Sequence, residues 1–511
     1  MPEKKLKILI ATPEVVPFAK TGGLADVTGS LPKALSKLGH QVKVILPKYK
    51  MVDETLFSLQ EVNINFPEIP LGEKKEKIKL KSCRLSASEG MSGPVHSEVE
   101  YLFIINDKYY ERDELYKDKA TGFDYADNDE RFILFARGTL EVLKALNWQP
   151  DIIHANDWQS ALLPAYLKTH YAGDPFFAGT ATVFTIHNLA YQGNFSKDTF
   201  PKIGVAKDIF YPTSPFEFWG NVNFLKVGIS YADVLNTVSE RYAVEIQSSS
   251  EFGYGLEGVL RTRNADLYGI VNGVDYEEWS PEKDKFIPHR YSMEDLSGKE
   301  KNKRALLEKC NLPKTAGREL GRNKKDVPLI GIISRLADQK GFDILAEISD
   351  KLLSLDLKMV LLGTGDEKYH KLFKQMAKKY PEKISVNLRF DDPLAHLIEA
   401  GSDMFLMPSR YEPCGLNQLY SLKYGTLPIV RETGGLADTI QDFDPNTGEG
   451  TGFVFKNYDS EELLEVVKKA LRVYQDKEVW TKLMRNGMQK DFSWQSSAKK
   501  YEALYQKALQ K

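Results

Sequence analysis

The chain carries one hexapeptide twice, as Thr21-Gly22-Gly23-Leu24-Ala25-Asp26 and as Thr433-Gly434-Gly435-Leu436-Ala437-Asp438. Each copy follows a short apolar run typical of a buried strand, residues 8–10 before the first copy and residues 428–430 before the second. A glycine pair between a strand and a helix exposes backbone N–H groups at the positive end of the helix, where an anion can bind. The repetition therefore predicts two similar lobes that face each other across a cleft.

Length and composition narrow the class of protein. At 511 residues the chain is too long for one ordinary hydrophobic core, so we expect two large domains. A net charge of −2 gives no reason to expect a nucleic-acid partner. The first apolar run is too short for a signal peptide, and no later run reaches the length of a membrane span. Because Cys83, Cys310 and Cys414 lie far apart, we predict a cytoplasmic protein without a disulfide framework.

Short aliphatic runs alternate with amphipathic helical patterns along almost the whole chain, which is typical of parallel sheets covered by helices. The predicted fold class is α/β, with two Rossmann-like parallel-sheet domains. Residues 77–84 and 99–105 instead alternate apolar and polar side chains, which predicts a hairpin at a sheet edge. The helix expected over residues 24–38 contains Pro32, which should kink or restart it. The strand candidates are residues 8–11, 42–46, 152–155, 182–186 and 234–237, followed by residues 329–333, 359–362, 384–388, 404–407 and 427–430.

The domain boundaries follow from where this alternation lapses. The predicted N-terminal domain spans residues 1–275. Residues 276–326 contain several prolines and a charged, glycine-containing stretch, so we expect an interdomain linker and a surface excursion there. The predicted C-terminal domain spans residues 327–490. Residues 491–511 form an amphipathic helical pattern, which we expect to pack back on the N-terminal domain.

In the first half, three polar residues stand where ligand-binding side chains occur. Lys20 precedes the first glycine pair, and an ammonium beside exposed N–H groups suits a phosphate. The alternative is a surface lysine before an ordinary turn. Asp157 and His187 each follow a strand, and the carboxyl ends of parallel strands project into the ligand crevice. The alternatives are a helix-capping role for Asp157 and a structural role for His187.

In the second half, Arg335 and Lys340 follow the strand predicted at residues 329–333. Both cations could neutralise a diphosphate leaving group, and a solvated ion-pair site is the alternative. Glu412 follows another strand, in an irregular loop that turns the N–H groups of residues 415–417 outward at a helix start. A carboxylate there suits sugar hydroxyls or a developing cationic sugar. The alternative is an acid that the helix dipole alone favours.

Several cofactor motifs are missing from the sequence. Residues 362–366 carry two glycines of a dinucleotide fingerprint but lack the third, so an NAD site is not predicted. No P-loop, zinc-ligand spacing or G-x-S-x-G nucleophile motif occurs. We therefore predict no cofactor and no metal.

Seven motifs together resemble one enzyme family in their order and spacing. The chain resembles the bacterial glycogen synthases and plant starch synthases, which are retaining glucosyltransferases of the two-domain GT-B architecture. The resemblance runs from about residue 7 to the C-terminal helix. The motifs are residues 20–24, 154–158, 185–188, 271–275, 334–336 with Lys340, 412–416 and 433–438.

The resemblance implies transfer of glucose from ADP-glucose, with UDP-glucose as the alternative donor, to the non-reducing 4-hydroxyl of an α-1,4-glucan such as glycogen. It implies that Glu412, His187, Arg335, Lys340 and Asp157 are catalytic. The donor-binding residues that it implies are Lys20, Gly23, Asn272, Arg335, Lys340, Phe390, Gly415, Leu416 and Asn417. On the acceptor and sugar side, it implies Asp26, Tyr116, Asp157 and Asn188.

Three positions depart from the pattern of the family. Phe390 stands where a tyrosine usually lies under the adenine, so base stacking survives while the choice of base is open. Asn417 stands where relatives often carry threonine or isoleucine. Tyr420 replaces a second glutamate of the wider group, which leaves ribose recognition open.

Retention of configuration is compatible with two displacements or with same-face attack. Two displacements need a carboxylate about 5 Å from an acid partner. In same-face attack the leaving diphosphate accepts the proton of the acceptor, and we favour this route. Because the implied phosphate ligands come from both domains, domain closure should complete the site. The competing classes are a sugar-nucleotide epimerase or another transferase, and a non-catalytic glycan-binding protein. The oligomeric state is open.

Overall fold

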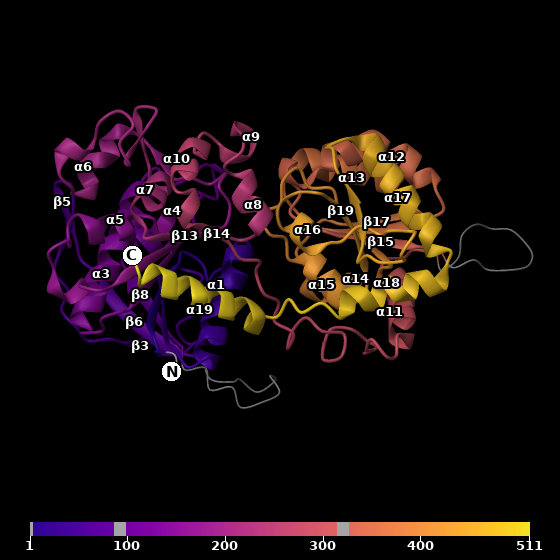
Figure 1. Ribbon diagram of the computed structural model, residues 1–511, viewed down its shortest axis with the longest axis horizontal. Coiled ribbons are helices and arrows are strands. Elements are labelled where there is room, and N and C mark those ends of the chain that lie inside the picture. The colour runs from indigo at the N-terminus through magenta and orange to yellow at the C-terminus, as the bar shows by residue number, and fades with distance from the viewer. Residues whose placement is uncertain (1–3, 86–98, 314–326) are drawn as a thin grey trace, which may run out of the picture. The chain divides into compact units, whose positions relative to one another are not determined.

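The structure is a computed structural model that describes residues 4–85, 99–313 and 327–511 (Figure 1). Its contacts divide the chain into two compact units. Unit 1 comprises Met1–Val238, Ala243–Gly273 and Trp494–Lys511, and unit 2 comprises Ser239–Tyr242 and Val274–Ser493. Each unit is built around its own mainly parallel sheet, which confirms the predicted α/β class.

The sheet of unit 1 has nine strands among the described residues, in the order β14-β13-β9-β8-β1-β2-β7-β6-β3. The central strands pair in parallel, with Ile8 of β1 opposite Val42 of β2 and Ile152 of β8. The predicted edge hairpin is confirmed, because β6 pairs antiparallel with β7. The strands are β1 (Lys7–Ala11), β2 (Gln41–Pro47), β3 (Gln60–Glu61), β6 (Lys79–Arg84), β7 (Glu100–Ile105), β8 (Ile152–Asn156), β9 (Ala181–Ile186), β13 (Val234–Thr237) and β14 (Leu267–Gly269).

Two smaller sheets accompany this one. One pairs β4 (Ile69–Leu71) with β5 (Lys74–Glu76), and the other has the order β10-β12-β11. The latter contains β10 (Asn194–Phe195), β11 (Glu217–Phe218) and β12 (Asn221–Asn223). The helices of unit 1 are α1 (Gly23–Lys37), α2 (Asp107–Tyr110), α3 (Asn128–Ala145), α4 (Asp157–Ser160), α5 (Leu162–Lys168), α6 (Phe200–Ile203), α7 (Phe224–Tyr231), α9 (Ser250–Gly253), α10 (Glu257–Thr262) and α19 (Trp494–Ala508); α8 (Glu240–Glu245) crosses the unit boundary.

Helix α1 continues through Pro32, so the expected restart of the helix was wrong. Its apolar face is buried over most of its length, including Leu24, Val27, Leu31 and Leu35. Packing of such a face supplies most of the stability of a helix in a protein and outweighs one missing backbone hydrogen bond. Tertiary burial therefore overrides the local effect of the proline.

The last helix, α19, belongs to unit 1, where it lies beside α1 (Figure 1). Its Tyr501 hydroxyl donates to Asn236 Oδ1 over 3.1 Å, and its Tyr505 hydroxyl lies 2.9 Å from His154 Nδ1. Both tyrosines are fully buried. The polar tips of the amphipathic face therefore find partners inside the unit, at the strands β8 and β13.

The sheet of unit 2 has six parallel strands among the described residues, in the order β17-β16-β15-β18-β19-β20. Alternate residues of β15 enter two different core clusters, Ile330 and Ile332 the first and Leu329 the second. The sheet is thus buried on both faces, as parallel sheets usually are. The strands are β15 (Leu329–Ile333), β16 (Lys358–Leu362), β17 (Ile384–Asn387), β18 (Met404–Met407), β19 (Leu427–Arg431) and β20 (Phe453–Phe455).

The expected linker at residues 276–326 was wrong in part, because α11 (Ser297–Lys309) packs on α14 (Asp392–Gly401) inside unit 2. This helix was not predicted, because its buried face carries charged side chains. Lys299 Nζ donates to the carbonyl of Tyr424 and to the Thr426 hydroxyl, and Lys303 pairs with Asp403 over 2.8 Å. The charged stretch at residues 314–326 lies outside the described residues. The other helices of unit 2 are α12 (Phe342–Ser354), α13 (Glu367–Lys379), α15 (Asn417–Lys423), α16 (Gly434–Thr439), α17 (Ser460–Tyr474) and α18 (Lys477–Met488).

Across the described ranges, no helix combines the length and the apolar character that a membrane crossing requires.

Candidate active site

Glu14 organises the loop that follows β1. Its carboxylate accepts hydrogen bonds from Thr21 N at 2.5 Å, from the Thr21 hydroxyl at 2.6 Å and from Gly22 N at 3.2 Å. A fourth bond comes from the Tyr116 hydroxyl at 2.7 Å. Glu14 is buried, and no described residue forms an ion pair with it. A buried carboxylate with several donors is well stabilised, so it holds the glycine turn firmly.

This arrangement corrects the expectation for the first glycine turn. The N–H groups of Thr21 and Gly22 are occupied by Glu14 and cannot both serve an anion. Gly23 starts α1 and is exposed, and its N–H donates to no described residue. Lys20 is exposed and forms an ion pair with Asp26 at 2.7 Å. The turn therefore leaves Gly23 and Lys20 as the groups that can meet a ligand.

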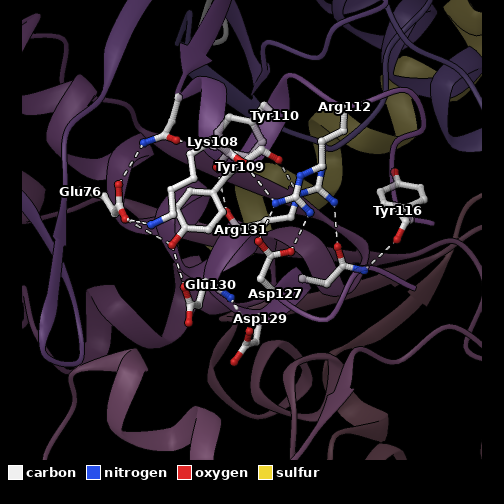
Figure 2. A network of polar contacts seen from close by, with 12 residues as sticks. Glu76, Lys108, Tyr109, Tyr110, Arg112, Tyr116, Asp127, Asp129, Glu130 and Arg131 are labelled. Carbon is white, nitrogen blue, oxygen red and sulfur yellow. Dashed lines mark hydrogen bonds and ion pairs between the residues drawn. The ribbon is translucent and has the colours of Figure 1, made fainter. Parts of the chain in front are cut away.

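A buried arginine ties down the segment that carries Tyr116 (Figure 2). Arg131 donates to the carbonyl oxygens of Tyr109 and Leu115 and to Asn128 Oδ1, all within 2.8 Å. Asn128 in turn donates to the Tyr116 carbonyl at 2.9 Å. Burial lowers the pKa of Arg131, and an arginine side chain keeps its charge in proteins. The cation thus fixes the backbone that leads to Tyr116, and Asn128 holds the Tyr116 carbonyl.

Asp157 and His187, from the ends of β8 and β9, meet as the sequence predicted. The His187 N–H donates to Asp157 Oδ1 at 2.8 Å, and His187 Nε2 lies 2.9 Å from Asn156 Oδ1. Asp157 has a φ of +55°, an uncommon conformation for a residue with a side chain. Its side chain accepts a second backbone bond, from Asn188, and does not cap α4.

Burial sets the protonation of this pair. It raises the pKa of Asp157 to about 7, and the nearby charge of Glu14 acts in the same direction. It lowers the pKa of His187 to about 3, so the imidazole is neutral at physiological pH. Neighbouring His154 is likewise neutral, with its pKa lowered to about 3, and is held between Tyr505 and Thr185 as a structural residue. A buried carboxyl that titrates near neutrality is a frequent mark of a functional site.

Asn272 is the last predicted site residue of unit 1. It is buried, and its Oδ1 accepts no hydrogen bond from any described residue. A buried carbonyl oxygen without a donor is costly, and in native proteins it usually has an explanation. A ligand that donates a hydrogen bond would satisfy this oxygen. A donor-binding role for Asn272 was implied by the resemblance to the family.

In unit 2, Lys340 and Glu412 come together from loops that follow β15 and β18. Lys340 Nζ lies 2.6 Å from Glu412 Oε2, which also accepts from the Ser409 hydroxyl at 2.9 Å. Glu412 is buried and Lys340 partly so. The pair is 72 residues apart in sequence. A cation and a carboxylate of this kind can act together on a sugar and on a departing anion.

Two further predicted residues of unit 2 are exposed. Arg335 lies in the same loop as Lys340 and forms no ion pair or hydrogen bond with the described residues through its guanidinium. Phe390 exposes 80% of its surface at the loop before α14. Its neighbour Arg389 is bound to Asp391. A free guanidinium and a bare ring are groups that a phosphate and a base can contact.

The loop of residues 415–417 is shaped by side chains as well as by glycine. Gly415 has a φ of +73°, and an added Cβ would lie 2.3 Å from Gln418 Oε1. Asn417 Nδ2 donates to the Ile333 carbonyl at 2.7 Å, which ties the start of α15 to the end of β15. Leu416 precedes α15 and is half-buried. The unusual Asn417 thus has a structural partner inside unit 2.

The second glycine turn is not an open anion site, so the expectation for it was wrong. Gly435 N donates to the Glu412 carbonyl at 3.0 Å. An added Cβ on Gly434 would lie 1.9 Å from that same oxygen. Both glycines therefore allow the turn to pack against the backbone of the Glu412 loop. They thereby support the loop that carries the Glu412 carboxylate.

Tyr420 has a packing role that accounts for one departure from the family pattern. Its ring stacks on Trp279 with centroids 4.0 Å apart, and Trp279 also stacks on His396 with centroids 3.7 Å apart. Among the described residues, one group could hold a metal ion, formed by Glu278, Asp392 and His396. Exposed acidic groups often lie together without an ion, and His396 already contacts Asp284 at 2.8 Å. The group contains none of the predicted site residues.

Glu14 and Arg131 were not predicted from the sequence. A glutamate three residues beyond a strand and seven before the glycine turn was a usable signal for Glu14, because the turn needs an acceptor for its N–H groups. Arg131 gave no signal, since a charged residue in a helical pattern is normally solvated.

Known proteins are similar to this chain over almost its whole length. Residues 7–262 match the family described as starch synthase catalytic domain, and residues 314–486 match glycosyl transferases group 1. A glycogen synthase of Desulforudis audaxviator (strain MP104C) is 48% identical over 100% of this chain and 98% of its own length. A glycogen synthase of Koribacter versatilis (strain Ellin345) is 47% identical over 99% of both chains.

A solved structure is similar over nearly the whole chain. The catalytic domain of starch synthase IV from Arabidopsis thaliana, bound to ADP and acarbose, is 32% identical with a TM-score of 0.87. The match covers 99% of this chain and 100% of that one. The sucrose-phosphate synthase of Thermosynechococcus elongatus, at 14% identity and a TM-score of 0.56, shares the fold alone.

Proposed function

We propose, from the premise that this chain belongs to the glycogen synthase and starch synthase family, that it lengthens an α-1,4-glucan by transferring glucose from a nucleotide-glucose with retention of configuration. The observation that carries the proposal is the pairing of Lys340 with Glu412 in the same unit as the free guanidinium of Arg335. A glycan-binding module has no need of such cations, whereas a transferase must stabilise a departing diphosphate.

The proposed donor is ADP-glucose, with Phe390 under the base and with Arg335 and Lys340 on the phosphates. Support comes from the similar catalytic domain of starch synthase IV, which is bound to ADP. Lys20 and the N–H of Gly23, both in unit 1, are proposed as further donor-binding groups.

The proposed mechanism is same-face attack. Glu412 Oε2 is bound by both Lys340 and Ser409, so this carboxylate is better placed to stabilise charge than to act as a nucleophile. The leaving diphosphate would take the proton of the acceptor 4-hydroxyl as the glycosidic C–O bond breaks and the new one forms. His187 is neutral, so its ring or its carbonyl oxygen would face the electron-poor sugar as a dipole.

Asp157 and Asn188 are proposed to line the sugar and acceptor side, with Asn272 near the donor sugar. Asp26 and Tyr116 act through the first loop, since each contacts a residue that shapes it. We propose that the reaction needs no metal, so that chelation with EDTA leaves the rate unchanged. A cytoplasmic location is proposed as well, in keeping with three free cysteines.

The decisive experiment is a coupled assay for nucleotide release with ADP-glucose and with UDP-glucose, each in the presence and absence of glycogen. We expect ADP release that depends on glycogen, with α-1,4 extension of labelled chains. Conversion of the donor without glycogen would indicate an epimerase or a hydrolase. Glycogen binding without nucleotide release would indicate a glycan-binding protein.

A further inference from the structure

The hairpin between β11 and β12 presents an aromatic side chain in an unfavourable conformation. Its two-residue tip is Trp219-Gly220, since Phe218 pairs with Asn221. Trp219 has a φ of +53° and Gly220 a φ of +81°. Positive φ at both positions defines a type I′ turn, where Asn-Gly is strongly preferred. A bulky residue in the left-handed region is a conformational outlier, and such outliers collect at functional sites.

Hydrogen bonds fix the backbone of the hairpin tip, although the Trp219 side chain is exposed. Glu217 accepts from Gly220 N at 2.6 Å and from Thr213 N at 2.8 Å, and these bonds lower the pKa of its carboxyl. Lys226 Nζ donates to the carbonyls of Ser214 and Glu217 at 2.8 and 2.5 Å. Trp219 exposes 84% of its surface. The unit therefore fixes the backbone so that an indole ring projects into solvent.

A second exposed aromatic residue with positive φ lies beside it. Tyr254, at the end of α9, has a φ of +50° and exposes 38% of its surface. A Cβ on the following residue, Gly255, would lie 3.0 Å from the Phe218 ring and 3.9 Å from Trp219 Nε1. The end of α9 and the hairpin tip are thus in contact. Two neighbouring aromatic residues therefore have a left-handed backbone conformation, and they belong to two different turns.

A third aromatic residue connects this place with the candidate active site. Tyr191 exposes 49% of its surface, and the next residue, Gln192, donates to the Tyr254 carbonyl at 3.2 Å. Tyr191 follows Asn188 by three residues. The Gly193 position packs on the Trp158 ring, where a Cβ would lie 2.5 Å away. We call Tyr191, Trp219 and Tyr254 the aromatic platform, which continues from the acceptor side of unit 1.

We propose that the aromatic platform binds a part of the α-1,4-glucan away from its reacting end. The choice of glucan rests on the proposed function. The less polar face of a glucose ring presents C–H groups, which pack well on indole and phenol rings, while the rings' polar atoms stay hydrated. Exposed rings beside the Glu217 carboxylate of the hairpin suit a neutral chain better than an anion. A platform of this kind would hold glycogen near the site between successive transfers.

The test measures glycogen binding without a donor, by affinity electrophoresis in gels that contain glycogen. Trp219→Asn removes the ring and installs the residue that the turn prefers. We expect its dissociation constant for glycogen to rise about tenfold while its melting temperature stays equal or increases. Tyr254→Asn should act in the same direction, because asparagine also tolerates positive φ. Leu56→Asn, which removes another exposed apolar side chain of unit 1, should leave binding unchanged.

Two results would overturn the proposal. One is glycogen binding by Trp219→Asn with the affinity of the unmodified protein. The other is a smaller oligomeric state of Trp219→Asn than of the unmodified protein in sedimentation, with unchanged glycogen affinity, which would assign the rings to self-association.

Kinetic measurements distinguish glucan binding by the aromatic platform from the proposed transferase activity. Trp219→Asn should raise the KM for glycogen more than the KM for maltotriose, because a trisaccharide is too short to occupy both places. If the unmodified protein binds glycogen through Trp219 but releases no nucleotide from either donor, the platform stands and the transferase proposal falls.

Discussion

The two copies of Thr-Gly-Gly-Leu-Ala-Asp are identical in sequence and differ in what they do. The copy in unit 1 opens α1, a helix of 15 residues, and is held by the Glu14 side chain. The copy in unit 2 opens α16, a helix of 6 residues, and is held by backbone oxygens of the Glu412 loop. The first turn is held by a side chain, whereas the second packs behind the carboxylate that we propose as catalytic, Glu412.

The glycines of the two turns differ accordingly. Gly22 has an extended backbone, and an added Cβ there would meet nothing within 4 Å. Gly434 has a φ of +44° and no room for a Cβ. Packing therefore does not require glycine at position 22, whereas it does at position 434. A repeated motif predicts a repeated local shape and leaves its chemical use to the surrounding structure.

The largest effect should come from the carboxylate that the second turn supports. We expect Glu412→Ala to lower kcat by about a thousandfold while the Kd for ADP changes little, because the lost interaction belongs to the transition state. Steady-state kinetics and calorimetric titration with ADP measure the two quantities. Glu461→Ala, which removes an exposed glutamate of the same unit, is the control. An equal loss of turnover and ADP affinity would contradict the role of Glu412.

The next effect compares the glycines directly. Gly434→Ala should lower the free energy of unfolding by about 3 kcal/mol, because it combines a left-handed backbone with a clash against the Glu412 carbonyl. Gly22→Ala should cost less than about 1 kcal/mol. Urea unfolding of both variants gives the difference. Equal destabilisation by the two changes would mean that the turns are held alike.

Removing the charge of Glu14 should disturb the first turn and leave the second turn unchanged, because Glu14 holds only the first. Glu14→Gln leaves a backbone N–H of the first turn without its acceptor, so we expect kcat/KM for the donor to fall about ten- to hundredfold. Tyr116→Phe removes one of the four bonds and should lower it by less than about tenfold. Donor saturation curves measure both. A Glu14→Gln enzyme with normal kinetics would show that the loop does not depend on this carboxylate.

The last prediction concerns Asp157, a buried carboxyl that differs from Glu412 in lacking a paired lysine. Asp157 has no cationic partner among the described residues, and its pKa of about 7 exceeds the ordinary value of 3.8. The folded state therefore binds an extra proton between pH 4 and 7, and its stability should fall by about 1 kcal/mol per pH unit as pH rises through that interval.

Asp157→Asn provides the control for this pH dependence, because the amide cannot titrate. Denaturant unfolding at pH 5, 6 and 7 should give a flatter profile for the variant than for the unmodified protein. Identical slopes would mean that Asp157 keeps an ordinary pKa in the folded state.

Much of the fold was predictable because parallel sheets leave a strong signal. Apolar runs such as residues 329–333 and 404–407 became β15 and β18 with little change in their ends. The meeting of Asp157 and His187 was also predictable, since neighbouring parallel strands end at one edge. Helix α11 was not, because its buried lysines look like surface residues until the carbonyl oxygens that receive them are known.

The amino-acid sequence alone determined the α/β class, the strand ends at which the polar residues gather, and the resemblance to the glucan synthases. These properties depend on periodicity and on neighbours along the chain. Only the tertiary structure decided that Glu14 occupies the first turn, that Lys340 holds Glu412, and that the second turn supports that pair. The physical reason is that several donors and acceptors along the chain could form each of these contacts. Only the folded structure shows which of them lie within hydrogen-bonding distance.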